Sequence, residues 1–170
     1  SSVSASEQKI KLSSFGPFES SEFFDITPTL KLPNMMHMEA TWDLQLSFNL
    51  EIASGAPGNA GAEFDGTYFY TTRWASNLLH RYDMTGNLVE EFTIPGVSEL
   101  RDLAFDGTYM YGGANANTIY VMDFTTKTLV GSIPSPVAVR NIAYDPVYDA
   151  LWVGNWDTPL TLVSKTGTTL

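Results

Sequence analysis

The chain contains no cysteine, which excludes disulfides, thiolate metal sites and cysteine nucleophiles. It also lacks any apolar run close to the ~20 residues that a membrane helix needs, so we expect no membrane insertion. The opening residues, SSVSASEQKIKL, lack the apolar core of a signal peptide. They fit either the mature end that remains after a signal peptide is cleaved or an arbitrary boundary within a longer chain. These absences leave the compartment open, because exported bacterial proteins often avoid cysteine too.

Basic residues are scarce. Nine Lys and Arg stand against nineteen Asp and Glu, which gives a formal net charge of -10. A surface of that sign repels phosphate backbones, and no local Lys/Arg cluster offsets it. We therefore expect no nucleic-acid partner and no attraction to anionic membranes.

The usual catalytic signatures are missing as well. The only histidines are His37 and His80, and there is no HExxH motif, nucleophile elbow or phosphate-binding glycine loop. The glycine-rich stretch GAPGNAG precedes a predicted strand rather than a helix, so it lacks the helix start that binds phosphate. The methionine cluster MMHME is more typical of hydrophobic packing than of a metal site. We expect no catalytic residues, no metal and no cofactor within this chain.

What the sequence does contain is a repeated phrase. EFDGTYFYTT, residues 63–72, returns as AFDGTYMYGG at residues 104–113, and a looser copy surrounds Asp145. The aspartates Asp65, Asp106 and Asp145 are 41 and 39 residues apart, and the third is followed by Pro146 instead of glycine. A period of about 40 residues is typical of repeat architectures.

Each copy divides into short runs rich in Val, Ile, Tyr, Phe and Thr, separated by turn residues such as Asp-Gly and Thr-Gly-Asn. Such runs predict strands and hairpins. Four strands in about 40 residues is the signature of a β-propeller blade. A β-sandwich gives no reason for the repeat, and a β-helix coil is usually shorter, so we predict an all-β propeller with four-stranded blades. Its aromatic residues are expected to fill the layers between blades: Phe64, Phe69, Phe105, Tyr111, Tyr120 and Trp152.

The repeats predict the organisation of the chain. Residues 1–41 form an extension of unclear structure, and residues 42–170 form propeller blades. The alternation in Trp42–Glu51 predicts a half-buried outer strand, residues 53–61 a loop, and the third copy only three strands. Three blades do not close a ring. Either the chain is part of a longer propeller, which we favour, or two chains form a homodimer in which Trp42–Glu51 of each completes the third blade of the other.

The predicted topology brings the start of each first strand and the end of each second strand to the same rim. Arginine, asparagine and tryptophan gather there, and these types together can bind a sugar or a carboxylate. Structural roles in ion pairs, turn capping or packing between blades are the alternative. The candidate ligand-binding residues are Arg73, Trp74, Arg101, Asn115, Asn117, Arg140, Asn155 and Trp156.

The phrases NAGAEFDGTYFYTTRWASNLLHRYDMTGNLVEEFTIPGV and LRDLAFDGTYMYGGANANTIYVMDF resemble the repeats of NHL- and YVTN-like propellers, in particular those of large exported Bacteroidetes proteins of the type IX secretion and cleaved-adhesin kind. The resemblance covers residues 42–170. It implies an extracellular or cell-surface location and a binding or adhesive role. The periplasm is the alternative location, and carbohydrate binding is suggested by the rim residues rather than by the resemblance. The resemblance brings no catalytic residue set with it.

Three functions follow as hypotheses. The first is a non-catalytic binding or adhesion propeller of an exported bacterial protein, which contacts a glycan or a protein through this rim. The second is a piece of a propeller hydrolase or lyase whose catalytic groups lie outside this chain. The third is a structural spacer that holds neighbouring domains.

Overall fold

The computed structural model describes Ile10–Lys11, Phe23–Phe24 and residues 46–170, and the chain divides into two compact units, Ser1–Leu46 and Ser47–Leu170. In the first unit β1 (Ile10–Lys11) pairs antiparallel with β2 (Phe23–Phe24). The second unit holds all the repeats. The predicted boundary after residue 41 falls outside the described residues, as does the methionine cluster.

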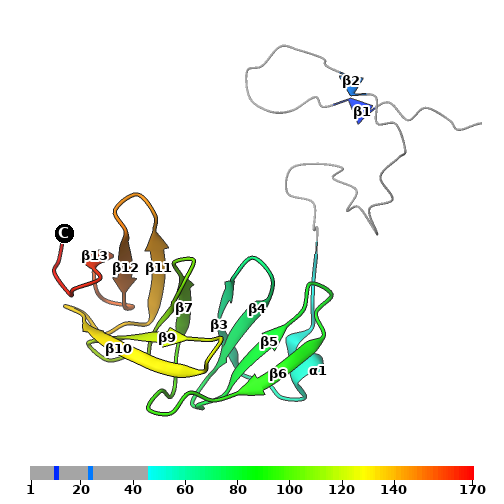
Figure 1. The fold of residues 1–170 in the computed structure, drawn as a ribbon, viewed down its shortest axis with the longest axis horizontal. Helices are drawn as coiled ribbons and strands as arrows, with labels where there is room; N and C mark the ends of the chain where they lie inside the picture. The colour runs from blue at the N-terminus through cyan, green and yellow to red at the C-terminus, as the bar shows by residue number, and fades with distance from the viewer. Residues whose placement is uncertain (1–9, 12–22, 25–45) are drawn as a thin grey trace, which may run out of the picture. The chain divides into compact units, whose positions relative to one another are not determined.

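The second unit consists of three antiparallel sheets, each with its strands in chain order (Figure 1). The first contains β3 (Asn59–Phe64), β4 (Phe69–Arg73), β5 (Leu79–Tyr82) and β6 (Leu88–Phe92). The second contains β7 (Asp102–Phe105), β8 (Met110–Gly113), β9 (Thr118–Asp123) and β10 (Thr128–Pro134). The third contains β11 (Asn141–Asp145), β12 (Ala150–Gly154) and β13 (Thr161–Ser164).

The first strands of successive sheets are neighbours, since β7 contacts both β3 and β11. The sheets therefore stand side by side as the blades of a propeller, with these strands innermost. This confirms the predicted all-β propeller with blades of about 40 residues. It also confirms the three strands of the third copy. Beyond them an isolated bridge joins Val163 to Thr169, so the end of the chain lies against β13.

Two layers of buried side chains hold the blades together. The first layer joins Tyr70, Leu79 and Phe92 to Leu103, Met110 and Met122. The second joins Tyr111, Ile119 and Ile133 to Ile142, Leu151, Val153 and Val163. Since adjacent residues of a strand point to opposite faces, Met110 serves the first layer and Tyr111 the second.

Three of the six aromatics predicted to fill these layers do so, whereas Phe64, Phe69 and Trp152 belong to neither layer. Tyr111 is buried in the second layer, and Phe105 and Tyr120 pack against the first. Phe64 is an exception, because it is 38% exposed and packs on Phe69 of its own sheet. Phe69 also lies elsewhere: it contacts Phe64 and Phe48 rather than the neighbouring blade.

The repeated aspartate has the same role in every blade. Asp65 accepts hydrogen bonds from the backbone amides of Thr67 and Tyr68 through one oxygen, and from the Tyr70 hydroxyl at 2.9 Å through the other. Asp106 bonds in the same way to Thr108, Tyr109 and Tyr111. In the third blade the donors are Val147, Tyr148 and the indole nitrogen of Trp152. The phrase therefore encodes a turn tied to an aromatic on the returning strand.

Carboxylates also tie each blade to the next. The Glu63 carboxylate of β3 accepts a hydrogen bond from the Phe105 amide of β7 at 3.0 Å. Asp102 of β7 accepts one from the Ile142 amide of β11, also at 3.0 Å. These bonds fix the offset of neighbouring inner strands, and with it the positions of the side chains at the rim.

The outer strand predicted over Trp42–Glu51 is wrong for its described part. Residues 46–49 have no regular structure, and Leu50–Ser54 form the short helix α1. Asn49 caps this helix by accepting a hydrogen bond from the Ile52 amide, and Gly55 ends it with φ of 70°. These two caps override the alternating pattern, so Leu50 and Glu51 belong to α1 rather than to a strand.

The segment around α1 lies against the first blade instead. The Phe48 ring meets Phe69 edge-on at 5.8 Å, and α1 contacts β6. The side chain of Asn59 accepts a hydrogen bond from the Thr71 hydroxyl on the same face of the sheet. The predicted loop over residues 53–61 is correspondingly shorter, because α1 and β3 occupy its ends. In the described part of the chain no helix is long and apolar enough to cross a membrane.

Candidate functional site

The predicted geometry of the rim is confirmed. Arg101 and Arg140 immediately precede the inner strands, and their amides donate to the carbonyls of Gly113 and Gly154, where the second strands end. Each arginine is thereby fixed beside the exit of its own second strand. Trp74, Asn115 and Trp156 follow these exits.

The first pair on the rim joins two blades. The Arg101 guanidinium of the second blade lies 3.7 Å from the ring centre of Trp74 in the first blade. The Arg101 side chain is only 12% exposed, whereas Trp74 is 51% exposed. One guanidinium nitrogen, Nη2, lies 3.4 Å from a Glu99 oxygen, and Nε and Nη1 are buried without a partner among the described residues. Arg101 therefore supports Trp74 more than it faces solvent.

The second pair lies within the third blade. The Arg140 guanidinium lies 3.9 Å from the ring centre of Trp156, whose side chain is 78% exposed. Arg140 is partly exposed and makes no ion pair with any residue that the structure describes. This pair is therefore the open one, with both a cation and an aromatic face accessible.

An amide bridge lies between the two pairs. The Asn155 amide nitrogen donates to the Asn115 side-chain oxygen at 3.2 Å, from the third blade to the second. The Asn155 oxygen accepts from the Trp156 backbone amide at 2.8 Å, so Asn155 also orients the tryptophan. Asn115 has φ of 56°, a left-handed conformation that asparagine tolerates well. Its own amide nitrogen has no acceptor in the described part of the chain.

The remaining two candidates lie outside this group. The Asn117 side-chain amide donates to the Ser135 carbonyl at 3.2 Å. This bond joins the start of β9 to the end of β10, at the end of the hairpin away from its turn. Arg73 is the last residue of β4 and lies opposite Asn59. The structure thus brings together Trp74, Arg101, Asn115, Arg140, Asn155 and Trp156.

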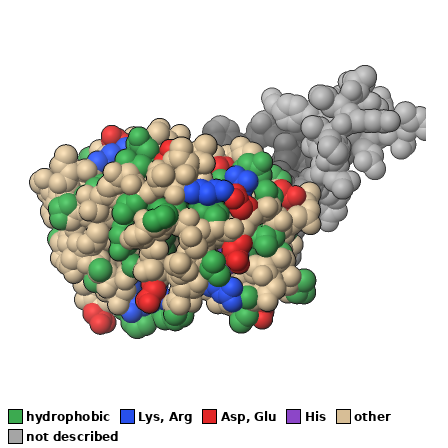
Figure 2. All heavy atoms as spheres, turned by 60° about the horizontal axis from the view of Figure 1, so that its bottom comes forward, with side chains coloured by type: hydrophobic (Ala, Val, Ile, Leu, Met, Phe, Trp, Pro, Cys, Tyr) green, Lys and Arg blue, Asp and Glu red, His purple; other side chains and the backbone are tan. Residues whose placement is uncertain are grey.

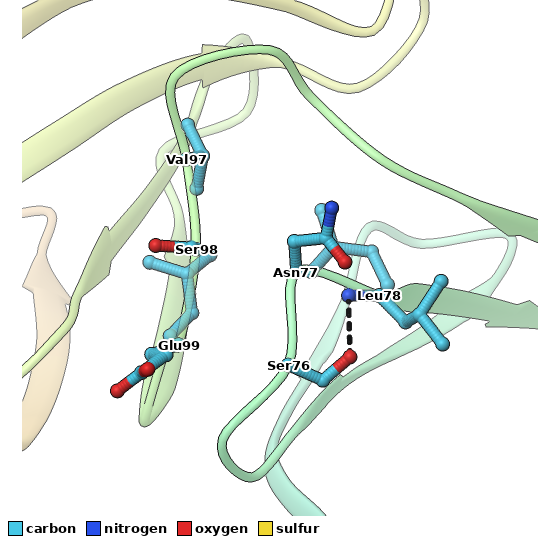
Figure 3. A pocket seen from close by; sticks show the side chains of 8 residues that line it. Ser76, Asn77, Leu78, Val97, Ser98 and Glu99 are labelled. Atoms are coloured by element: carbon cyan, nitrogen blue, oxygen red, sulfur yellow. Dashed lines mark hydrogen bonds between the residues drawn. The ribbon is translucent and has the colours of Figure 1, made fainter.

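Sequence reasoning missed a small hollow beside the first pair. Ser76 and Asn77 face Ser98 and Glu99 across it (Figure 3), and it is too narrow to hold a water molecule. The Glu99 amide donates to the Ser76 carbonyl at 2.7 Å. Glu99 stands two residues before Arg101, but its counterpart before Arg140 is apolar, so the repeat did not reveal it.

The charges of this rim differ from those of the whole chain. Three of the four arginines lie at strand ends here, although the protein is strongly acidic. On the face that Figure 2 shows, basic and acidic side chains are interspersed rather than gathered by sign. Next to Arg101, burial raises the pKa of Asp102 above its ordinary value, although the Ile142 amide bonded to it opposes the shift. The described residues contain no group of three His, Cys, Asp or Glu arranged to hold a metal.

No family model and no curated protein sequence matches this chain. Solved structures do match. The hydrazine synthase of Kuenenia stuttgartiensis aligns with 67% of this chain and 35% of its own, at 16% identity and a TM-score of 0.53. The glutaminyl cyclase of Myxococcus xanthus aligns with 58% of this chain and 50% of its own, at 16% identity and a TM-score of 0.50.

At such identities the likeness concerns the fold alone, and both neighbours are propeller-like. The fold is a β-propeller. The chain spans half or less of each of these neighbours, so their activities are no guide to its own.

Proposed function

We propose that this propeller is a non-catalytic binding module that contacts a saccharide through the rim formed by Trp74, Arg101, Asn115, Arg140, Asn155 and Trp156. The observation that carries the proposal is the pair of exposed tryptophans, each backed by an arginine from the start of an inner strand. An exposed indole costs solvation unless it has a partner, and a pyranose ring is a natural partner for a flat aromatic face.

The support is geometric. Each indole is held on one side by a guanidinium, so its other side is preorganised for stacking. The Asn115–Asn155 bridge places a side-chain amide between the two platforms, where it can serve sugar hydroxyls. The exported, cell-surface or periplasmic location, the bacterial adhesin context and the adhesive role belong to the same proposal and are supported by the resemblance of the repeats.

A glycan array tests the proposal. The wild-type protein is compared with Trp74→Ala, Trp156→Ala and the double variant, with Tyr148→Ala as the matched control. Tyr148 is also an exposed aromatic, but it lies in the turn after β11, at the opposite rim. We expect saccharide binding that each tryptophan variant weakens about tenfold or more and the control leaves unchanged. No binding to any saccharide, or binding that survives the double variant, overturns the proposal.

A further inference from the structure

We infer that the saccharide carries a carboxylate: the rim fits a short acidic oligosaccharide, with one sugar ring stacked on Trp156 and a neighbouring uronate paired with Arg140. This inference rests on the proposed function and names its ligand class. It depends on the difference between the two arginine–tryptophan pairs.

The first step is the difference in pairing. Glu99 is within hydrogen-bonding distance of Arg101, and the Arg101 side chain is almost entirely buried. Arg140 has the same place in its blade and also stacks on a tryptophan, Trp156 of its own blade, yet no described carboxylate pairs with it. A guanidinium carries five N–H donors and no acceptor, so an unpaired one at a binding rim favours an anionic ligand.

The second step is the orientation of the guanidinium. Because one face of Arg140 lies against the Trp156 ring, its N–H groups point outward in the plane of the group. That plane matches a carboxylate, which can accept two parallel hydrogen bonds. Trp156 is 78% exposed even with Arg140 against it, so a sugar can stack on the indole while its neighbour reaches the arginine.

The third step concerns charge. Asp157 follows Trp156 and is exposed, and the chain as a whole carries -10, so the long-range field repels anions. That field is screened beyond about 8 Å at physiological ionic strength, whereas a direct ion pair is not. A ligand with one or a few carboxylates is therefore favoured over a long polyanion.

The test is a titration followed by tryptophan emission and by calorimetry. The probes are a trimer of galacturonic acid and its carboxyl-reduced counterpart, a neutral trimer of galactose. The variants are Arg140→Lys and Arg140→Gln, with Tyr148→Ala as the control. We expect the acidic trimer to bind about ten to a hundred times more tightly than the neutral one, the usual range for a charge-assisted pair. Arg140→Gln should remove this preference, and Arg140→Lys should retain only part of it because lysine cannot make the planar pair.

The outcomes separate the inference from the proposed function. Equal binding of both trimers, or a preference that survives Arg140→Gln, overturns the carboxylate while the saccharide-binding rim stands. An acidic peptide that binds in place of both trimers overturns the saccharide as well. Unchanged thermal unfolding of the Arg140 variants shows that lost binding does not come from lost folding.

Discussion

A comparison of two turn aspartates, Asp106 and Asp65, can measure how much one ion pair between blades contributes to stability. Lys165, in the turn after β13, donates to Asp106 at 2.8 Å and to Asp149 at 2.6 Å. It thereby joins the third blade to the repeated turn of the second. We predict that Asp106→Asn destabilises the protein by about 1 kcal/mol more than Asp65→Asn does. The reason is that Asp65 makes the same turn bonds but no ion pair with a described residue.

The magnitude follows from the pKa of Asp106. Burial alone would raise this pKa, but the hydrogen bonds from Lys165, the Tyr109 amide and the Tyr111 hydroxyl outweigh it and lower the pKa from 3.8 to about 2. A shift of that size corresponds to about 2.4 kcal/mol in full. This figure is an upper limit, because Asp65 makes the equivalent bonds to its turn amides and tyrosine, and these cancel in the comparison. Only the part due to Lys165 remains, and since that side chain is 31% exposed, screening by solvent reduces it to about 1 kcal/mol.

The dependence on pH has a definite sign. The folded state holds the pKa of Asp106 below its unfolded value, so the stabilisation is complete above about pH 4 and is lost as pH falls through about 2. The extra cost of Asp106→Asn over Asp65→Asn should therefore be full near neutral pH and shrink towards zero at about pH 2.

Urea unfolding of both variants and the wild type, at neutral pH and at about pH 2, measures this difference directly. Lys165→Met provides an independent route, and a double-mutant cycle with Asp106→Asn should give a coupling of about 1 kcal/mol. Equal losses for the two aspartate variants at every pH would refute the reasoning, because the lysine would then contribute nothing between the blades.

The remaining predictions concern packing and one titration. A Cβ on Gly113 would lie 2.3 Å from a Val139 methyl and 2.8 Å from the Val139 carbonyl oxygen, so Gly113→Ala should cost about 1 to 3 kcal/mol in urea unfolding. Gly131→Ala is its control, because nothing lies within 4 Å of the added atom; an equal loss for both would contradict the packing argument. Trp152→Phe removes the indole donor that lowers the pKa of Asp145, so the pKa should rise towards its ordinary value in an NMR titration. An unchanged pKa would mean that this bond is not formed in solution.

The blades could be predicted from the sequence because their signals are local and occur more than once. Each strand is a run of β-forming residues, and each first hairpin carries its own aspartate, so two good copies were enough to place the strands of the third. In the second copy, for example, the short β-forming runs LRDLAF and TIYVMDF contain β7 and β9 almost to the residue. The spacing also predicted which residues share a rim, because the start of one strand and the end of the next lie together in any antiparallel pair.

The segment before the first blade could not be predicted in the same way, because it has no second copy. Its alternating pattern from Trp42 to Leu50 favours a strand, yet Asn49 and Gly55 cap a helix across its end. Phe48 then packs against Phe69, which had been expected between blades. Which side of the sheet such a segment covers is decided by tertiary contacts, and those leave no periodic trace in the sequence.

The partners of the rim residues were hidden for a different reason. Register shows that Trp74, Asn115 and Trp156 occupy equivalent positions. Each lies five residues after the residue that pairs with the neighbour preceding the repeated aspartate: Phe69, Met110 and Leu151. Counted from the repeated aspartates, Trp74 and Asn115 coincide but Trp156 does not, because the turn after Asp145 is two residues longer. The alignment by aspartate therefore concealed a position that alternates between tryptophan and asparagine.

That position shows how a repeat can carry both a shape and a site. The residues that all three copies share, the turn aspartate and the aromatic that donates to it, are committed to bonds within the blade. The position at the opposite rim takes no part in the bonds of that turn. There Trp74 and Trp156 stack on arginines, and Asn115 accepts a hydrogen bond from Asn155 of the next blade. A side chain that the fold does not need can vary from blade to blade without loss of stability. Recognition is therefore expected where the copies differ, and the substitutions that test it are those at Trp74, Trp156 and Arg140 rather than at the repeated phrase.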